Sequence, residues 1–257
     1  RDNLVLGSAG NGIDGAHILT PMPYLMTLGT ITQNNQPLPM KILARLNLDG
    51  QAISVAQAYA DLKVGTDATP LKDIFAKKKA EGAMAKVAVT FPGGTHDLWM
   101  RYWLASAGIH PDTDVETIVV PPPQMVANMK VGTMYAFCVG EPWNAVAVTK
   151  DIGFTTLATQ DLWEHHPEKA LVVNAAFAEQ TDTLKDVMGA LLEACKWLDD
   201  PDNRAEAAEF IGTEAYVNAK PEDIRGRLTG TYELGAGLGS KTFTGTQMQF
   251  FRDGQTN

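Results

Sequence analysis

The segment from Lys86 to Gly108 most constrains how this 257-residue chain can fold. The run KVAVTF at 86–91 is typical of a buried strand, and Pro92-Gly93-Gly94 breaks it. His96 to Ala107 then has the pattern of an amphipathic helix, which Gly108 ends. Further strands are predicted at 114–120 and 135–139, with a helix at 122–130 between them. Repeated strand–helix units predict an α/β protein with a parallel sheet covered by helices.

Segments on both sides of this region extend the α/β pattern. Strands are predicted at 12–17, 40–48 and 171–177, and helices near 4–6, from Thr20, within 58–85, and at 183–198 and 204–216. We expect residues 1–85 to form part of lobe 1 and residues 86–165 to form lobe 2. Residues 166–257 would then be a return segment whose C-terminal helices pack mainly on lobe 1. A chain that crosses between two lobes more than once places a cleft at the crossing.

Composition excludes several classes of function. The chain has 21 Lys and Arg against 30 Asp and Glu, a formal net charge of −9, and no basic run that would suit nucleic acid. No apolar stretch approaches the ~18–20 residues that span a bilayer. Cys138 and Cys195 lie in apolar surroundings, which favours two buried free thiols.

No motif in the chain argues for catalysis or for a bound cofactor. The G-x-S-x-G elbow and the nucleotide-triphosphate loop are absent from the sequence. The glycine-rich run at 7–12 precedes a predicted strand, which is the wrong order for the dinucleotide fingerprint. The pair His165-His166 lacks metal-ligand spacing and is interpreted as a surface loop. We therefore expect no cofactor, no metal and no enzymatic activity.

The turn at 90–97 (TFPGGTHD) is the best candidate for a binding site. A glycine-containing turn that opens a helix aims backbone N–H groups and the positive end of the helix dipole at one point, which suits a small anion. Thr95 and His96 stand at the same place, although an ordinary strand-to-helix turn capped by Thr95 explains the local sequence equally well. Lys169 lies at the mouth of a strand, where it either reaches solvent or supplies a charge to an anion. Trp143 either walls a cleft or packs in the core.

The chain resembles a known family through four segments taken together. They are GIDGAHILTPMP, KVAVTFPGGTHDLWMRYWLASAGIHPDTD, PPPQMVANMKVGTMYAFCVGEPW and HPEKALVV. They are similar to the nitrate-binding and bicarbonate-binding proteins of cyanobacterial ABC importers, which are type II periplasmic solute-binding proteins. The resemblance covers essentially the whole chain and implies two α/β lobes that close on a small anion. It also implies that parts of the family domain lie before Arg1 and after Asn257, so that this is an internal fragment.

The resemblance also implies a ligand and the residues that bind it. Nitrate binders carry a His in the Gly-rich turn and a Lys in the HPEK segment, where bicarbonate binders carry Gln and Glu. His96 and Lys169 match the nitrate type, and nitrate, a monoanion without a proton, needs donors and positive charge. The nitrate-binding set that follows is His96, Lys169, Gln51 (with Gln57 as a competing match), Thr90, Gly94 and Thr95.

The resemblance implies the role and location of the protein as well. It would capture nitrate, and also nitrite, at the periplasmic face of the plasma membrane, held there by a lipid anchor outside this fragment. It would pass the anion to the permease and ATPase subunits of the importer. Three alternatives stay open: a bicarbonate receptor, a nitrate-sensing regulatory domain of the ATPase subunit, and an enzyme of the related two-lobed folds that make a thiamine precursor.

Overall fold

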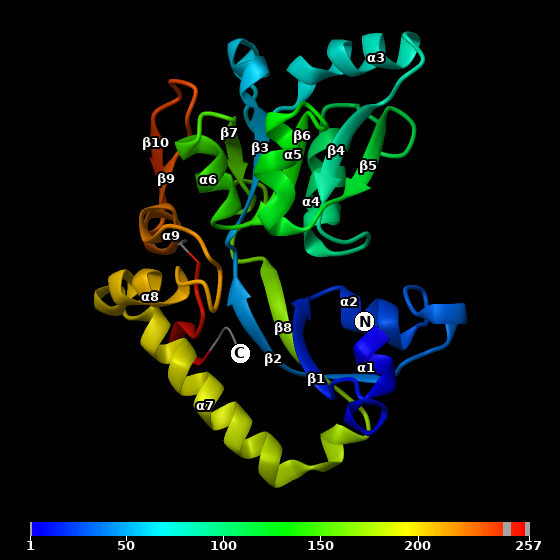
Figure 1. Cartoon of the computed structure of the whole chain (residues 1–257), viewed down its shortest axis with the longest axis vertical. Helices are drawn as coiled ribbons and strands as arrows, with labels where there is room; N and C mark the ends of the chain where they lie inside the picture. The colour runs from blue at the N-terminus through cyan, green and yellow to red at the C-terminus, as the bar shows by residue number, and fades with distance from the viewer. Residues whose placement is uncertain (1, 244–247, 255–257) are drawn as a thin grey trace.

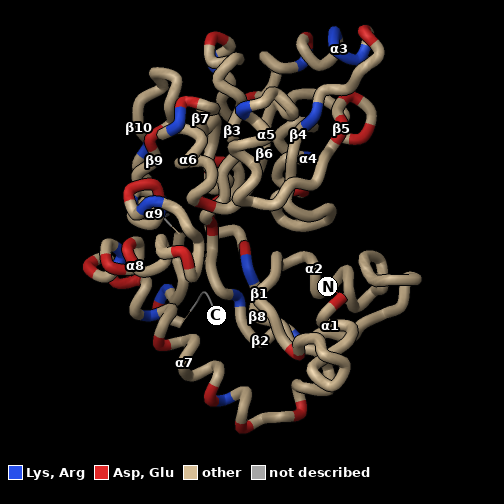
Figure 2. Tube along the Cα trace, in the orientation of Figure 1, with Lys and Arg blue, Asp and Glu red and all other residues tan. Residues whose placement is uncertain are grey.

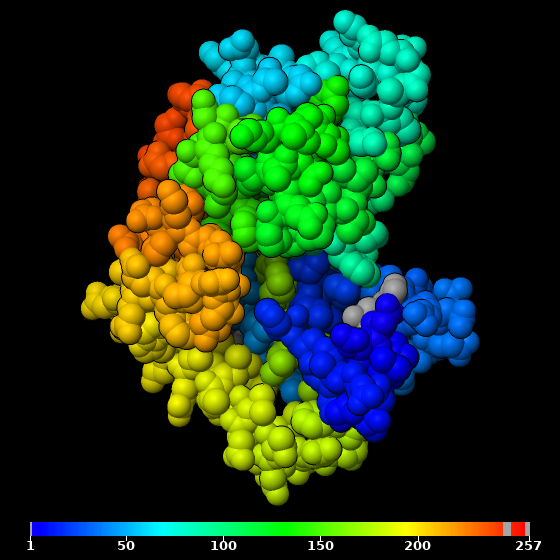
Figure 3. Space-filling model, viewed as in Figure 1, coloured from blue at the N-terminus to red at the C-terminus, as the bar shows by residue number. Residues whose placement is uncertain are grey.

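The computed structural model describes residues 2–243 and 248–254, and the elements below lie within those ranges. They form two lobes, each built on its own sheet, and the chain passes between the lobes more than once (Figure 1). The space-filling view is hollowed between the lobes, where strands of the lower lobe show through (Figure 3). The two-lobed α/β architecture predicted from the sequence is therefore confirmed.

Lobe 1 contains a three-stranded antiparallel sheet in the order β1-β8-β2. Its strands are β1 (Gly15–Leu19), β2 (Met40–Leu48) and β8 (Pro167–Asn174), with helices α1 (Asp2–Leu6) and α2 (Met22–Thr27) beside them. Lys169 on the central strand lies in register with Leu19 on one side and Asn47 on the other. Thr20 does not cap α2 as predicted, because its hydroxyl donates to the carbonyl of Glu168 at 3.1 Å.

Lobe 2 contains a five-stranded sheet in the order β5-β4-β6-β3-β7. Its strands are β3 (Gln51–Ala56), β4 (Ala85–Val89), β5 (Val115–Val119), β6 (Ala136–Gly140) and β7 (Gly153–Ala158). The parallel pairing predicted from the strand–helix units is found between β4 and both β5 and β6. Strand β3, which was not predicted from the sequence, pairs antiparallel with β6 and β7, because it enters straight from lobe 1 without a crossover helix.

Helices pack on both faces of this sheet (Figure 1). They are α3 (Lys72–Ala80), α4 (Thr95–Ser106), α5 (Met125–Lys130) and α6 (Trp143–Thr149). Buried side chains from α3, α4 and the sheet form one hydrophobic cluster around Trp103 and Phe75. Side chains from α5, α6 and the sheet form a second cluster around Phe137. These two clusters form the core of lobe 2, and α4 extends from this core toward lobe 1.

The first crossing between the lobes lies at Asp49–Gly50, not near residue 85 as expected. Residues 51–56 are all buried within the sheet of lobe 2, and Phe75 of α3 belongs to the core of that lobe. The crossing was not predicted because the composition of residues 58–85 favours a helix. Within that range an α-helix forms only at 72–80. The backbone has a positive φ at Asp49 (+61°) and at Gly50 (+93°). The second crossing occupies residues 159–166, between β7 and β8.

The C-terminal segment connects the two lobes instead of packing mainly on lobe 1. It comprises α7 (Thr181–Asp199), α8 (Arg204–Ile211), α9 (Pro221–Thr229), β9 (Thr231–Glu233) and β10 (Ser240–Thr242). The backbone of Leu234 accepts a hydrogen bond from Thr155 of β7 at 2.8 Å. Arg227 of α9 lies 3.4 Å from Glu141 and donates to Thr155, both residues of lobe 2. The end of the described chain returns to lobe 1, where Gln249 bridges to Leu48.

Both cysteines are buried free thiols, as predicted.

Within the described residues no helix combines the length and the apolar character needed to cross a bilayer. Basic and acidic residues are interspersed along both lobes (Figure 2).

Candidate anion-binding site

Four chain segments bring polar side chains together between the lobes. Gln51 begins β3, Thr90 follows β4, Thr95 and His96 begin α4, and Lys169 lies on β8. All five were predicted from the sequence as anion ligands. Gln51, His96 and Lys169 lie around one further residue, Glu168, which the sequence analysis did not select, while Thr95 contacts Gln51 and Thr90 contacts His96.

The Glu168 carboxylate is buried at the centre of this cluster. Its Oε1 accepts from Gln51 Nε2 at 2.5 Å and from Lys169 Nζ at 2.6 Å. Its Oε2 accepts from the same ammonium at 2.8 Å, and His96 Nε2 lies 3.4 Å from Oε1. Gln51 Nε2 also lies 2.6 Å from Thr95 Oγ1. One internal carboxylate therefore accepts hydrogen bonds from β3 and β8 and lies beside a histidine of α4.

The sequence contains a signal that would have found Glu168. β8 begins at Pro167, four residues before the predicted strand at 171–177. Glu168, Ala170 and Val172 alternate along the buried face of this strand. A carboxylate in phase with the apolar residues of a strand is a buried charge, and a buried charge requires partners.

The electrostatic environment keeps this carboxylate ionised. Burial alone raises the pKa of Glu168, but the charge of Lys169 and the adjacent His96 ring outweigh burial and lower the pKa to about 2. Lys169 is the more accessible partner, with 30% of its side chain exposed. The ion pair thus has a buried negative end and a more exposed positive end.

His96 is buried and oriented by two neighbours. Its Nδ1 forms a short hydrogen bond with the Thr90 hydroxyl, and its Nε2 faces Glu168. A hydroxyl that donates to Nδ1 leaves the proton on Nε2, so these partners favour a ring that presents an N–H donor at Nε2. Burial lowers the pKa of His96, and the neighbouring Glu168 opposes that shift only in part. Thr90 is therefore a residue that orients His96.

The Gly-rich turn is less open than predicted. The Gly93 N–H donates to the Asp97 carboxylate at 2.7 Å, and the Gly94 N–H donates to the Phe91 carbonyl at 3.1 Å. The amides that helix geometry leaves for a ligand are instead those in the first turn of α4, from Thr95 onward. Gly94 has another role, because a Cβ built there would lie 2.4 Å from Leu19 Cδ1 of lobe 1. Its missing side chain lets the two lobes approach at the site.

The His165-His166 pair is not the surface loop that was expected. His166 is buried, bonded through Nε2 to Thr159 at 2.7 Å, and its ring centroid lies 4.7 Å from that of Trp99. Asp49 of the first crossing lies 3.7 Å from a ring nitrogen of each histidine. The two crossings therefore pack against each other, and Gln51 is held there because its carbonyl accepts from Thr159 at 3.1 Å.

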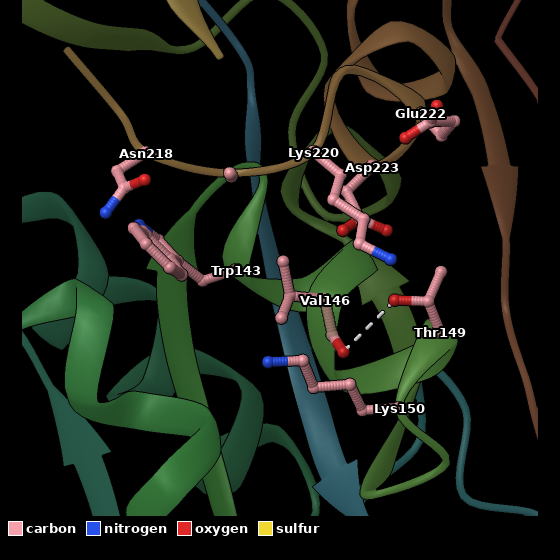
Figure 4. A pocket seen from close by; sticks show the side chains of 9 residues that line it. Trp143, Val146, Thr149, Lys150, Asn218, Lys220, Glu222 and Asp223 are labelled. Carbon is pink, nitrogen blue, oxygen red and sulfur yellow. Dashed lines mark hydrogen bonds between the residues drawn. The ribbon is translucent and has the colours of Figure 1, made fainter. Parts of the chain in front are cut away.

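A separate cavity of about 690 Å³ lies outside this cluster, between α6 and the segment that leads into α9 (Figure 4). Trp143 lines it beside Asn218, with Lys150 and Lys220 nearby (Figure 4). Trp143 therefore contributes to this second cavity and not to the site around Glu168.

Comparison with known sequences assigns the chain to a family. The model of the NMT1-like family matches residues 1–212. The chain belongs to the NMT1-like family.

Two curated relatives show where the chain lies within this family. The nitrate/nitrite binding protein NrtA of Synechococcus elongatus is 50% identical over 254 residues, which are 98% of this chain and 57% of that protein. The bicarbonate-binding protein CmpA of the same species is 37% identical over 92% of this chain and 53% of its own length. The chain therefore spans little more than half the length of these relatives.

A solved structure agrees with this placement. The crystal structure of the periplasmic nitrate-binding protein NrtA from Synechocystis PCC 6803 superposes with a TM-score of 0.93 at 49% identity. The match covers 98% of this chain and 64% of that chain. The two-lobed α/β architecture is thus the periplasmic-binding-protein fold predicted from the sequence.

Proposed function

We propose that this protein is a receptor that captures nitrate, and nitrite as well, for an ABC importer. The observation that carries the proposal is the convergence of Gln51, His96 and Lys169, from two lobes, around a single carboxylate. Two of these groups have capacity for a further anion, because Lys169 uses two of its three N–H groups on Glu168 and the buried His96 Nε2 has no hydrogen-bond partner among the described residues. Similarity to proteins named for nitrate supports the choice of ligand.

The proposed binding set follows from this geometry. Lys169 supplies the positive charge, His96 and Gln51 supply N–H donors, and the first turn of α4 at Thr95 supplies backbone N–H groups. Thr90 orients His96, and Gly94 admits the side chain of Leu19 from lobe 1. Closure of the lobes around the anion would then report its presence to the transporter.

The receptor would act in the periplasm, anchored at the membrane face by a lipid, and would deliver the anion to permease and ATPase subunits. The relatives are named as binding proteins, and the proposed role makes and breaks no bond. A signal peptide with a lipid-attachment Cys upstream of Arg1 would support this setting, whereas a nucleotide-binding domain there would favour the regulatory alternative.

Bicarbonate is the second candidate, and Glu168 is the observation that favours it. A carboxylate at the site can accept the O–H that bicarbonate has and nitrate lacks. Identity to the nitrate/nitrite binding protein, however, is higher than identity to the bicarbonate-binding protein. We therefore prefer nitrate.

Calorimetric titration with nitrate, nitrite and bicarbonate tests the proposal. We expect heat of binding with nitrate and none with bicarbonate. Binding of bicarbonate alone would refute the ligand and keep the class of protein, and no binding of any of the three would refute the function.

Lys169→Glu is the matching mutational test. The change removes the cation and places a second carboxylate beside Glu168, so nitrate affinity should fall at least ~100-fold. Lys196→Glu on the exposed face of α7 introduces the same change of charge away from the site and should leave affinity unaltered. Circular dichroism checks that both variants fold. Equal affinities of the two variants would remove Lys169 from the site.

A further inference from the structure

We infer that Glu168 is the residue that restricts the site to singly charged anions, acting as a built-in negative charge among the donors. The inference rests on the proposed function, because it concerns which anions the same site accepts.

The position of Glu168 is that of an internal anion. Its side chain has 2% of its surface exposed, and its Oε1 lies within 2.5–3.4 Å of donors from Gln51, Lys169 and His96. Gln51 is 117 residues away in the chain, so the contact forms only when the lobes are assembled. An incoming anion must share these donors with a carboxylate that cannot leave.

The charges around the site balance without a ligand. Lys169 contributes one positive charge and Glu168 one negative charge, and burial favours the neutral form of His96. The other buried carboxylate on α4, Asp97, is paired with Arg101 at 2.8 Å and with the Gly93 amide. Glu141, near the end of β6, lies 3.4 Å from Arg227. The cluster therefore carries no surplus positive charge to hold a dianion.

The repulsion from Glu168 scales with the charge of the ligand. At equal distance the repulsion free energy of a dianion is twice that of a monoanion. The repulsion therefore reduces the affinity for a dianion by the square of the factor by which it reduces the affinity for a monoanion. The attraction between Lys169 and the ligand also doubles from a monoanion to a dianion. In the unaltered protein this attraction and the repulsion from Glu168 offset each other. Removing the carboxylate leaves Lys169 uncompensated, which favours a dianion over nitrate.

Glu168→Gln, compared with the unaltered protein, tests this inference with nitrate and sulfate as ligands. The substitution keeps the size of the side chain and an acceptor oxygen while removing the charge. We expect the unaltered protein to bind nitrate and not sulfate. We expect the variant to gain sulfate binding, with a rise in sulfate affinity at least 10 times the change in nitrate affinity.

Two controls separate charge from structure. Glu168→Asp retains the charge and should still reject sulfate, which a purely structural role would not require. Glu116→Gln alters an exposed carboxylate on β5 and should change neither affinity.

The inference is overturned if Glu168→Gln still rejects sulfate, if it binds neither anion, or if both affinities change by one factor. Sulfate binding by the unaltered protein as tight as nitrate binding overturns it without any variant. If the unaltered protein binds neither nitrate nor nitrite, the proposed function fails instead. That outcome is measured on the unaltered protein alone, so it is distinct from failure of the inference about Glu168.

Discussion

Asp49 is a fully buried acid at the first crossing between the lobes. Burial raises its pKa to about 7, although backbone groups of His165 and His166 partly oppose the shift. Burial also lowers the pKa of His166 to about 4. Folding therefore favours a protonated Asp49 and a neutral His166, so that the crossing is buried with little net charge.

This pair of shifts predicts how stability depends on pH. The contribution of Asp49 is fully present below the unfolded pKa of about 3.8 and is lost as pH rises through 7. Asp49→Asn should therefore match the unaltered protein near pH 4 and exceed its unfolding free energy by about 4 kcal/mol at pH 8. Urea unfolding at both pH values measures the difference.

His166 provides the opposite control. Its contribution is present above pH 6.5 and is lost as pH falls through about 4, so His166→Gln should flatten the acid side of the stability profile. A difference between Asp49→Asn and the unaltered protein that does not grow with pH would contradict this account of Asp49.

The turn between β4 and α4 is the element that joins site and lobe contact. Gly93 has a φ of +75°, which permits the sharp reversal after Pro92, and Gly94 lies against Leu19 of β1. The turn therefore serves two purposes, since it starts the helix that carries His96 and also forms part of the surface on which the lobes meet.

Gly94→Val should push the lobes apart at this point. The added Cβ would meet Leu19 Cδ1 at 2.4 Å, and overpacking of this kind costs about 1–3 kcal/mol. We expect nitrate affinity to fall about 5- to 100-fold while far-UV circular dichroism stays unchanged. Leu19→Ala combined with Gly94→Val should recover most of the loss because it vacates the space. A double variant as weak as the single one would show that the effect is local to the turn.

At the scale of the whole molecule, an anion held by both lobes stabilises the folded protein by mass action. Nitrate at 100 times its Kd should raise the unfolding free energy by about 2.7 kcal/mol. The rise in Tm, measured by calorimetric scanning with and without nitrate, should disappear in Lys169→Glu. The overall charge of −9 does not prevent binding, because salt screens it beyond ~8–10 Å. An equal nitrate shift in both proteins would indicate binding elsewhere.

Much of the fold could be predicted because local patterns encode it. The strand at 40–48 matches β2, and the helices at 183–198 and 96–107 match α7 and α4 to within two residues. Strand β3 was missed because its six residues are all buried and show no alternation. Helix α6 and strand β7 were also missed, since short apolar runs do not distinguish helix from strand.

The sequence by itself determined the α/β class, the glycine turn at 93–94 and the residue types of the candidate site. Each of these depends on side-chain chemistry and on spacings of a few residues. Only the tertiary structure decided that the chain crosses between lobes at Asp49–Gly50, and that Glu168 lies where the donors meet. Both depend on which distant strands pair and which buried charges become neighbours, and those energies arise only after the two lobes have assembled.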